Sequence, residues 1–138
     1  VGDQTGNNSN NNTFVAYCFA EKKGYSKFGS YVGNGSTNGS FIYTGFKPAF
    51  VLLKRKDGGD HWNIPVFTTD TNGTVNTVSP NLSAAERTMN ENPAIDYYSN
   101  GFKLKTVDAN YNTSGGNYIY MAIGQSLVGS NNTPCTAR

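Results

Sequence analysis

His61 is the only histidine of the chain and stands between Asp60 and Trp62. An imidazole can act as a general base in nucleophilic catalysis only beside a nucleophile and an orienting acid. The surrounding sequence contains no motif that supplies these groups, and no pair of carboxylates stands out as the acid and base of a glycosidase. We therefore expect a chain without enzymatic activity, in which His61 lies at the surface or on an edge strand.

Four oxygen-bearing side chains lie close together in the sequence: Asp57, Asp60, Asp70 and Asn72. Calcium takes several such ligands, but the spacing of a calcium-binding loop is missing. Asp and Asn are also common turn residues. We interpret these side chains as solvated turn residues and expect no metal or cofactor.

The chain contains two cysteines, Cys18 and Cys135. Their positions match neither a zinc site nor a CxxC redox motif, which leaves an intrachain disulfide, an interchain disulfide and two free thiols as alternatives. Cys18 lies in an apolar run, where free cysteine usually packs as a small hydrophobe. We favour core packing for Cys18 and a free or intermolecular thiol for Cys135.

Tyrosine is frequent, with nine copies, and several stand near Asn and Asp in polar segments. Such side chains build many sugar-recognising surfaces through ring stacking and directed hydrogen bonds. The alternative is that most of these rings lie in the core or in cross-strand pairs. Trp62 and Tyr111 are the rings we most expect to be exposed, and a glycan-binding surface is predicted at Trp62, Tyr111, Asn72 and Asn112.

Composition sets the class of protein. Charged residues make up 14% and aromatics 13% of 138 residues, and the many Gly, Asn, Ser and Thr residues are typical of short strands joined by tight turns. A net charge of +2 from dispersed Lys and Arg argues against nucleic acid as a partner. No apolar run is long enough to cross a bilayer, so no membrane contact is expected. Because the chain begins with Val rather than Met, we expect that it was cut or excised from a longer one.

Apolar runs separated by turn residues predict strands over residues 13–21, 25–32, 40–44, 49–54, 61–67, 74–78, 95–98, 102–106 and 117–125. Residues 49–54 form the most continuous apolar run, which predicts a central strand covered on both faces. Ser99, Asn100 and Gly101 indicate a tight hairpin. Ser83 and Glu86 have the spacing of a capping box and predict one helical turn within residues 79–92. The predicted core is Phe50, Leu52, Ile95, Phe102, Tyr118 and Met121.

Two of these runs resemble each other. TFVAYCFAE at residues 13–21 repeats the pattern of NYIYMAIGQ at residues 117–125, at a separation of 118 − 14 = 104 residues. That separation is the size of one β-domain, so residues 13–21 are interpreted as the closing strand of a preceding repeat. Residues 1–12 are then a flexible arm or linker and residues 13–138 a single domain. This strand must be covered, either as an extra strand of its own domain's sheet or by a neighbouring subunit. We predict an assembly with contacts at Phe14, Val15, Tyr17, Phe19 and Cys135, the last as a covalent lock.

These patterns together predict an all-β fold. We expect an antiparallel β-sandwich, jelly-roll or lectin-like, of about nine strands with at most one short helical turn.

An ordered set of motifs carries a resemblance to a known family. It consists of FVAYCFAE (14–21), GYSKFGSYVGNGSTNGSFIYTGFKPAFVLLKR (24–55), PNLSAAE (80–86), SNGFKL (99–104), YIYMAIG (118–124) and SNNTPCTAR (130–138). In this order the chain resembles a repeat domain of large structural proteins of marine tailed bacteriophages. The family usually has Ala where this chain has Cys135. The resemblance implies a tail-fibre or adhesion-type role at the virion surface, outside cells.

Two functions are therefore expected. The first is a bacteriophage virion structural module that forms homo-oligomers or joins other virion proteins and contacts host surface glycans. The second is a self-assembling extracellular filament or capsid-decoration subunit, held together by strand exchange and without a ligand.

Overall fold

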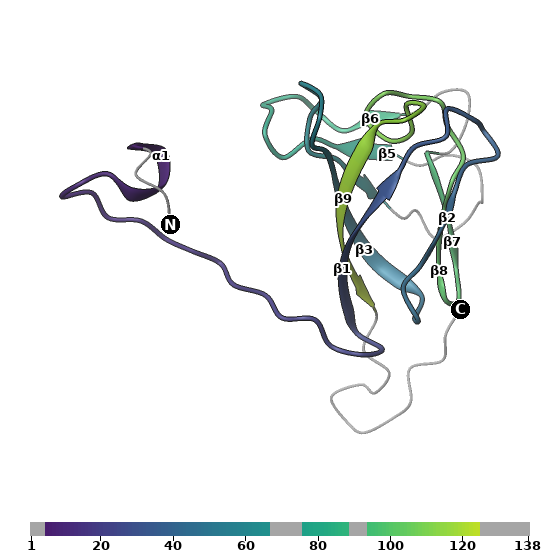
Figure 1. Cartoon of the computed structure of the whole chain (residues 1–138), viewed down its shortest axis with the longest axis horizontal. Coiled ribbons are helices and arrows are strands. Elements are labelled where there is room, and N and C mark those ends of the chain that lie inside the picture. Colours follow the sequence, from purple (N-terminus) through teal and green to yellow (C-terminus); the bar gives the residue numbers. More distant parts are fainter. Residues whose placement is uncertain (1–4, 67–75, 89–93, 125–138) are drawn as a thin grey trace.

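The computed structural model describes residues 5–66, 76–88 and 94–124 (Figure 1). These residues form one four-residue helix, α1 (Thr5–Asn8), and nine strands. The strands are β1 (Ser26–Val32), β2 (Phe41–Tyr43), β3 (Pro48–Arg55), β4 (Ile64–Val66), β5 (Asn76–Val78), β6 (Arg87–Thr88), β7 (Ile95–Tyr98), β8 (Gly101–Leu104) and β9 (Asn117–Gly124).

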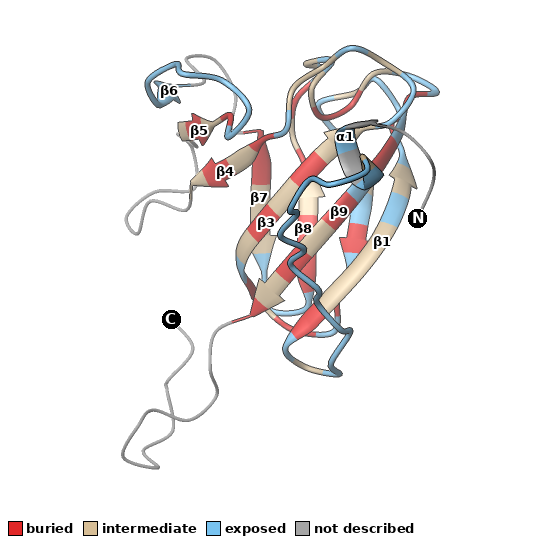
Figure 2. Cartoon of the chain, turned by 90° about the vertical axis from the view of Figure 1, so that its left-hand side faces the viewer, coloured by how far each residue is buried: buried red, intermediate tan, exposed pale blue. Residues whose placement is uncertain are grey.

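The strands form three antiparallel sheets of three strands each. Their orders are β1-β9-β3, β2-β8-β7 and β4-β5-β6. The first two sheets face each other, and the small third sheet lies at one end of them (Figures 1 and 2). A bridge between Leu53 and Asn63 joins β3 to the chain entering β4. The predicted all-β antiparallel sandwich of about nine strands is confirmed.

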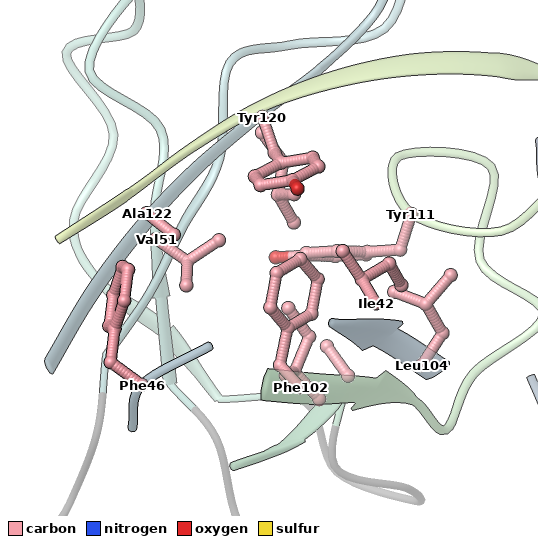
Figure 3. Packing of buried hydrophobic residues seen from close by; sticks show 11 residues of the cluster. Ile42, Phe46, Val51, Phe102, Leu104, Tyr111, Tyr120 and Ala122 are labelled. Carbon is pink, nitrogen blue, oxygen red and sulfur yellow. The ribbon is translucent and has the colours of Figure 1, made fainter. Parts of the chain in front are cut away.

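The core fills the space between the two larger sheets. Sheet β1-β9-β3 contributes Val51, Leu53, Tyr120 and Ala122, and sheet β2-β8-β7 contributes Ile42, Ile95, Phe102 and Leu104 (Figure 3). The rings of Phe102 and Tyr120 meet edge to face, with their centroids 5.5 Å apart. Alternate residues of each strand point inward, which is the period-2 pattern of a sheet with one covered face.

Half of the predicted core is wrong. Ile95, Phe102 and Tyr118 are buried as expected, but Phe50, Leu52 and Met121 are only half-buried. Val51 pairs with Ala122 and Leu53 with Tyr120 on the inward face, so their neighbours along the chain point to the opposite side. The prediction that residues 49–54 are covered on both faces is also wrong, because only one face of β3 is packed against a second sheet.

The hairpin predicted around residues 99–101 is confirmed. Tyr98 pairs with Gly101, and Ser99 and Asn100 form the two-residue loop. Only glycine fits at position 101, because a Cβ atom there would meet the carbonyl oxygen of Ile42 on the neighbouring strand.

The helical turn predicted within residues 79–92 is not formed in the described part of that segment. Leu82 N donates to Ser79 O at 3.0 Å in a turn, and residues 83–86 are exposed coil before β6. The local capping spacing is therefore overridden, since no apolar face follows it that could pack a helix.

Candidate functional site

Two of the four predicted glycan-binding residues lie inside the protein. Tyr111 is 1% exposed, and its hydroxyl lies 2.6 Å from Thr77 Oγ1. Its carbonyl oxygen accepts a hydrogen bond from the Tyr31 hydroxyl at 2.8 Å. Burial raises the pKa of the Tyr111 hydroxyl. Tyr111 is therefore a core residue and not a stacking platform for a sugar.

Asn112 is fully buried and joins the loop between β1 and β2 to the loop between β8 and β9. Its Oδ1 accepts from Asn34 N at 2.9 Å, and its Nδ2 donates to Asn34 Oδ1 at 3.0 Å. Nδ2 also donates to the carbonyl oxygens of Ser36 and Thr106, at 2.8 and 2.9 Å. These partners use both donors of the amide and one of its two acceptor positions, inside the protein. The prediction of a binding role for Asn112 is corrected to a structural one.

Trp62 is exposed, as expected, and lies beside a small polar cluster. Its backbone N donates to Asn81 Oδ1 at 3.1 Å, and Asn81 Nδ2 lies 3.2 Å from His61 Nδ1. Asn72 lies outside the described residues. The structure therefore does not bring Trp62, Tyr111 and Asn112 together into one surface.

The acids near His61 are held by one arginine. Arg55 pairs through Nε with Asp57 at 2.8 Å and through Nη1 with Asp60 at 3.2 Å. Asp57 Oδ2 also accepts from the side chain and the backbone N of Asn117, both at 2.8 Å. The hydrogen bonds from Asn117 and then from Arg55 lower the pKa of Asp57. No group of three or more His, Cys, Asp or Glu in the described ranges could hold a metal ion.

Four of the five predicted assembly residues, all except Cys135, lie in one exposed segment. This is residues 13–21, named here the apolar segment. It belongs to none of the three sheets, so the strand predicted there is not formed within this chain. Val15 is 77% exposed and Tyr17 83%, while Phe14 and Phe19 are also exposed. In Figure 1 the segment leaves the end of β1 and runs away from the sandwich. Its apolar side chains have no cover from the described parts of the chain.

Cys18 lies in the same segment and is a free, exposed cysteine. Its predicted packing in a core is therefore wrong for the chain by itself. Cys135 lies outside the described residues.

A tight turn connects the apolar segment to β1. Lys22 and Ser26 form an antiparallel bridge, with Ser26 N donating to Lys22 O at 2.9 Å and Lys22 N to Ser26 O at 3.1 Å. Gly24 has a φ of 78°, which favours glycine in such a turn. Lys27 Nζ and Glu21 Oε1 form an ion pair at 3.0 Å. The chain is thus folded back along the edge of β1 before the apolar segment departs.

The sheet β1-β9-β3 has a second face, which no described element covers. Seven apolar side chains point to it, and we name this surface the outer face: Phe28, Val32, Phe50, Leu52, Ile119, Met121 and Ile123. Val32 is 55% exposed and Ile119 38%, and the other five are half-buried. Figure 2 looks onto this face; the apolar segment passes in front of it, and Figure 1 shows that the segment stands off from it.

Sequence reasoning missed the outer face. The alternation of Ile119, Met121 and Ile123 with Tyr118, Tyr120 and Ala122 makes both faces of β9 apolar. That pattern predicts a strand buried on both sides. The signal was therefore present, but the described residues supply a cover for only one side.

Comparisons with known proteins add a family but no function. Among the described residues, no helix has both the length and the apolar character needed to cross a membrane. No curated protein and no solved structure matches the chain. A family described as a domain of unknown function, DUF7483, matches residues 1–126, which include both the apolar segment and the sandwich. The chain belongs to the DUF7483 family.

Proposed function

We propose that this chain is a non-enzymatic structural module that assembles with copies of itself through the apolar segment and the outer face. The observation that carries the proposal is that one molecule has an exposed apolar segment and, on the same side, an apolar sheet face that no described element covers. The motif resemblance described above supports a place at the surface of a bacteriophage virion, in a tail fibre or an adhesion protein.

The energy available at these surfaces favours assembly. Fully burying a Val, Leu, Ile, Phe or Met side chain is worth about 1.5–3 kcal/mol. Five such side chains are exposed, namely Phe14, Val15, Phe19, Val32 and Ile119, and the five half-buried ones of the outer face would each gain a part of that value. Together they reach at least the low end of the cost of association, roughly 4–15 kcal/mol. Uncovered, a segment this apolar is an aggregation hazard.

A second candidate, contact with host glycans, has its own support. Phe41, Tyr43 and Tyr98 are exposed on sheet β2-β8-β7, and the rings of Phe41 and Tyr98 meet edge to face at 5.8 Å. These rings lie on the side of the molecule away from the outer face. Binding of soluble oligosaccharides, measured by calorimetry and lost in Tyr43→Ala but not in Tyr25→Ala, would support this candidate. No binding by the intact chain would remove it.

Assembly is tested by light scattering coupled to size exclusion. We expect the intact chain to elute above its monomer mass of 14.9 kDa and the Val15→Ser/Tyr17→Ser double variant to elute as a monomer. Tyr98→Ser, which removes an exposed ring elsewhere, is the matched control and should assemble like the parent. Equal masses for the parent and the double variant would contradict the proposal.

A further inference from the structure

We propose that the free edge of β1 is the acceptor for the apolar segment of a second copy, which adds there as a fourth, antiparallel strand with Cys18 opposite Ser30. This inference rests on the proposed function and names the partner surface for the apolar segment. Three observations carry it: the backbone groups of β1 that face away from β9, the turn that precedes β1, and the side chains that would meet.

Only every second residue of β1 directs its backbone groups to β9, which leaves the other edge of β1 open. Gly124 N donates to Tyr25 O and Gly33 N to Gly116 O, so the odd-numbered residues from 25 to 33 direct their backbone groups to β9. The even-numbered residues direct theirs to the other edge. Within the described ranges, only Ser26 has a backbone partner there, namely Lys22. Phe28, Ser30 and Val32 therefore present an unpaired row of donors and acceptors, which is a template for another strand.

The turn before β1 indicates the register that the apolar segment of the same chain would take, and a segment exchanged across a twofold axis would take the same one. Lys22 is opposite Ser26, and the Ser26 hydroxyl donates to Ala20 O at 2.9 Å. Extending this antiparallel pairing by the alternation of a ladder places Ala20 opposite Phe28, Cys18 opposite Ser30 and Ala16 opposite Val32. The backbone groups of the apolar segment would then meet the open groups of β1.

Side chains fit this register on both faces. The small residues Ala16 and Cys18 would stand on the outer face beside Val32 and Ser30, and the larger Val15, Tyr17 and Phe19 would stand on the inner side of the sheet. On the other face Phe19 would stand opposite Gly29, whose missing side chain leaves its surface to the Tyr120 ring, 2.8 Å from where a Cβ would lie. The Tyr120 ring, from the neighbouring strand β9, already covers this glycine, and Phe19 would pack beside that ring.

A second copy, and not the same chain, is the occupant that the geometry favours. In its own chain the apolar segment stays at the edge of β1 only as far as Ala20, whose carbonyl oxygen accepts from the Ser26 hydroxyl. It then runs away from the sandwich, although the turn is already formed (Figure 1). Each molecule thus projects one strand and offers one open edge. Two molecules related by a twofold axis satisfy both features at once, with the segments crossing near Ala20.

A disulfide trap tests the register and the partner together. In the full chain, Cys135→Ser removes the second native thiol, and Ser30→Cys places a thiol opposite Cys18. Directly opposed residues in an antiparallel pair are about 5.5 Å apart between Cα atoms, within reach of a disulfide. The matched controls are Cys135→Ser alone and Cys135→Ser/Lys27→Cys, whose new thiol is on the opposite face of β1.

With oxidised glutathione as the oxidant, we expect Cys135→Ser/Ser30→Cys to shift from 14.9 kDa to twice that mass on non-reducing gels. Its digest should contain a disulfide-linked pair of peptides, one with Cys18 and the other with the thiol introduced at position 30. The controls should remain mostly monomeric.

Two other outcomes would overturn the inference. A monomer without free thiols would show that the disulfide forms within one chain, which would overturn the choice of a second copy. A monomer with free thiols would show that the apolar segment does not pair with the edge of β1. Light scattering of the reduced protein shows separately whether the chain assembles. If it assembles but its thiols stay free, the edge of β1 is not the acceptor, and the proposed assembly itself still stands.

Discussion

The two faces of sheet β1-β9-β3 are built from alternate residues of the same strands, yet the part of the chain that the structure describes covers only one. Leu53 on the inner face is fully buried against sheet β2-β8-β7, whereas Leu52, its neighbour, is half-buried on the outer face. Both faces are apolar along β9, where Tyr120 and Ala122 alternate with Ile119 and Met121. The described residues of one copy bury the inner face, and the proposed assembly would bury the outer one.

The outer side of the opposite sheet shows what a solvent-facing surface looks like in this protein. There Lys105 pairs with Asp96 at 3.6 Å, and Lys103 Nζ donates to Asn38 Oδ1 at 2.6 Å. Charged and polar side chains interrupt its aromatic rings. The outer face of β1-β9-β3 is interrupted less, chiefly by serines and by Lys54 at its rim. This contrast is the one that the proposed assembly through the outer face predicts.

The largest expected effect comes from the inner face. Leu53→Ala should lower the free energy of unfolding by about 2–5 kcal/mol, because it leaves a cavity beside Tyr120 in a closed core. Urea melts followed by tryptophan fluorescence measure this change. A loss below about 1 kcal/mol would show that the inner face is not the core.

Removal of the buried Asn112 side chain should have the next largest effect. Asn112→Ala removes the partner of Asn34 N and leaves buried donors and acceptors unpaired, which should cost about 1–3 kcal/mol. Asn81→Ala, which alters an exposed amide, is the control and should change the melt by about 0.5 kcal/mol or less. Equal effects of the two variants would contradict the structural role given to Asn112.

Leu52→Ala is the direct counterpart of Leu53→Ala. Because Leu52 is half-buried in one copy, its truncation should cost about 1 kcal/mol at concentrations where the chain is monomeric. The same variant should weaken assembly, seen as a rise in the concentration at which light scattering detects oligomers. A cost equal to that of Leu53→Ala under monomeric conditions would erase the distinction between the two faces.

The smallest effect concerns the rim of the outer face and depends on pH. The pKa of Asp57 is lowered below its ordinary value of 3.8 by Asn117 and Arg55. Its contribution to stability is therefore present above about pH 4 and is lost as the pH falls through the depressed pKa. Asp57→Asn should flatten the stability profile below about pH 4 and leave the shape above about pH 5 unchanged. Profiles of the same shape across the acid range would contradict this assignment.

Much of the fold is predictable from the sequence because its strands are bounded by Asn, Gly and Pro. The hairpin at Ser99 and Asn100 and the closing strand are found nearly to the residue. Which residues of β3 point into the core could not be predicted, because a continuous apolar run has no alternation that distinguishes Leu52 from Leu53.

The candidate site is less predictable, for two physical reasons. Tyr111 and Asn112 stand in a polar loop, and their burial depends on partners as remote as Asn34, 78 positions away in the chain. Local composition contains no trace of such a contact. The apolar segment is recognisable as a run that needs cover, but its pattern says nothing about which strand pairs with it.

The central claim is that residues 13–21 become covered when copies of the chain meet. Hydrogen exchange measured by mass spectrometry at a dilute and a high concentration tests this directly, because backbone amides in a formed ladder exchange slowly. We expect peptides containing Tyr17 and those containing Phe28 and Ser30 to become protected at high concentration, while peptides from sheet β2-β8-β7 do not change. Free exchange of the apolar segment at both concentrations would contradict the account.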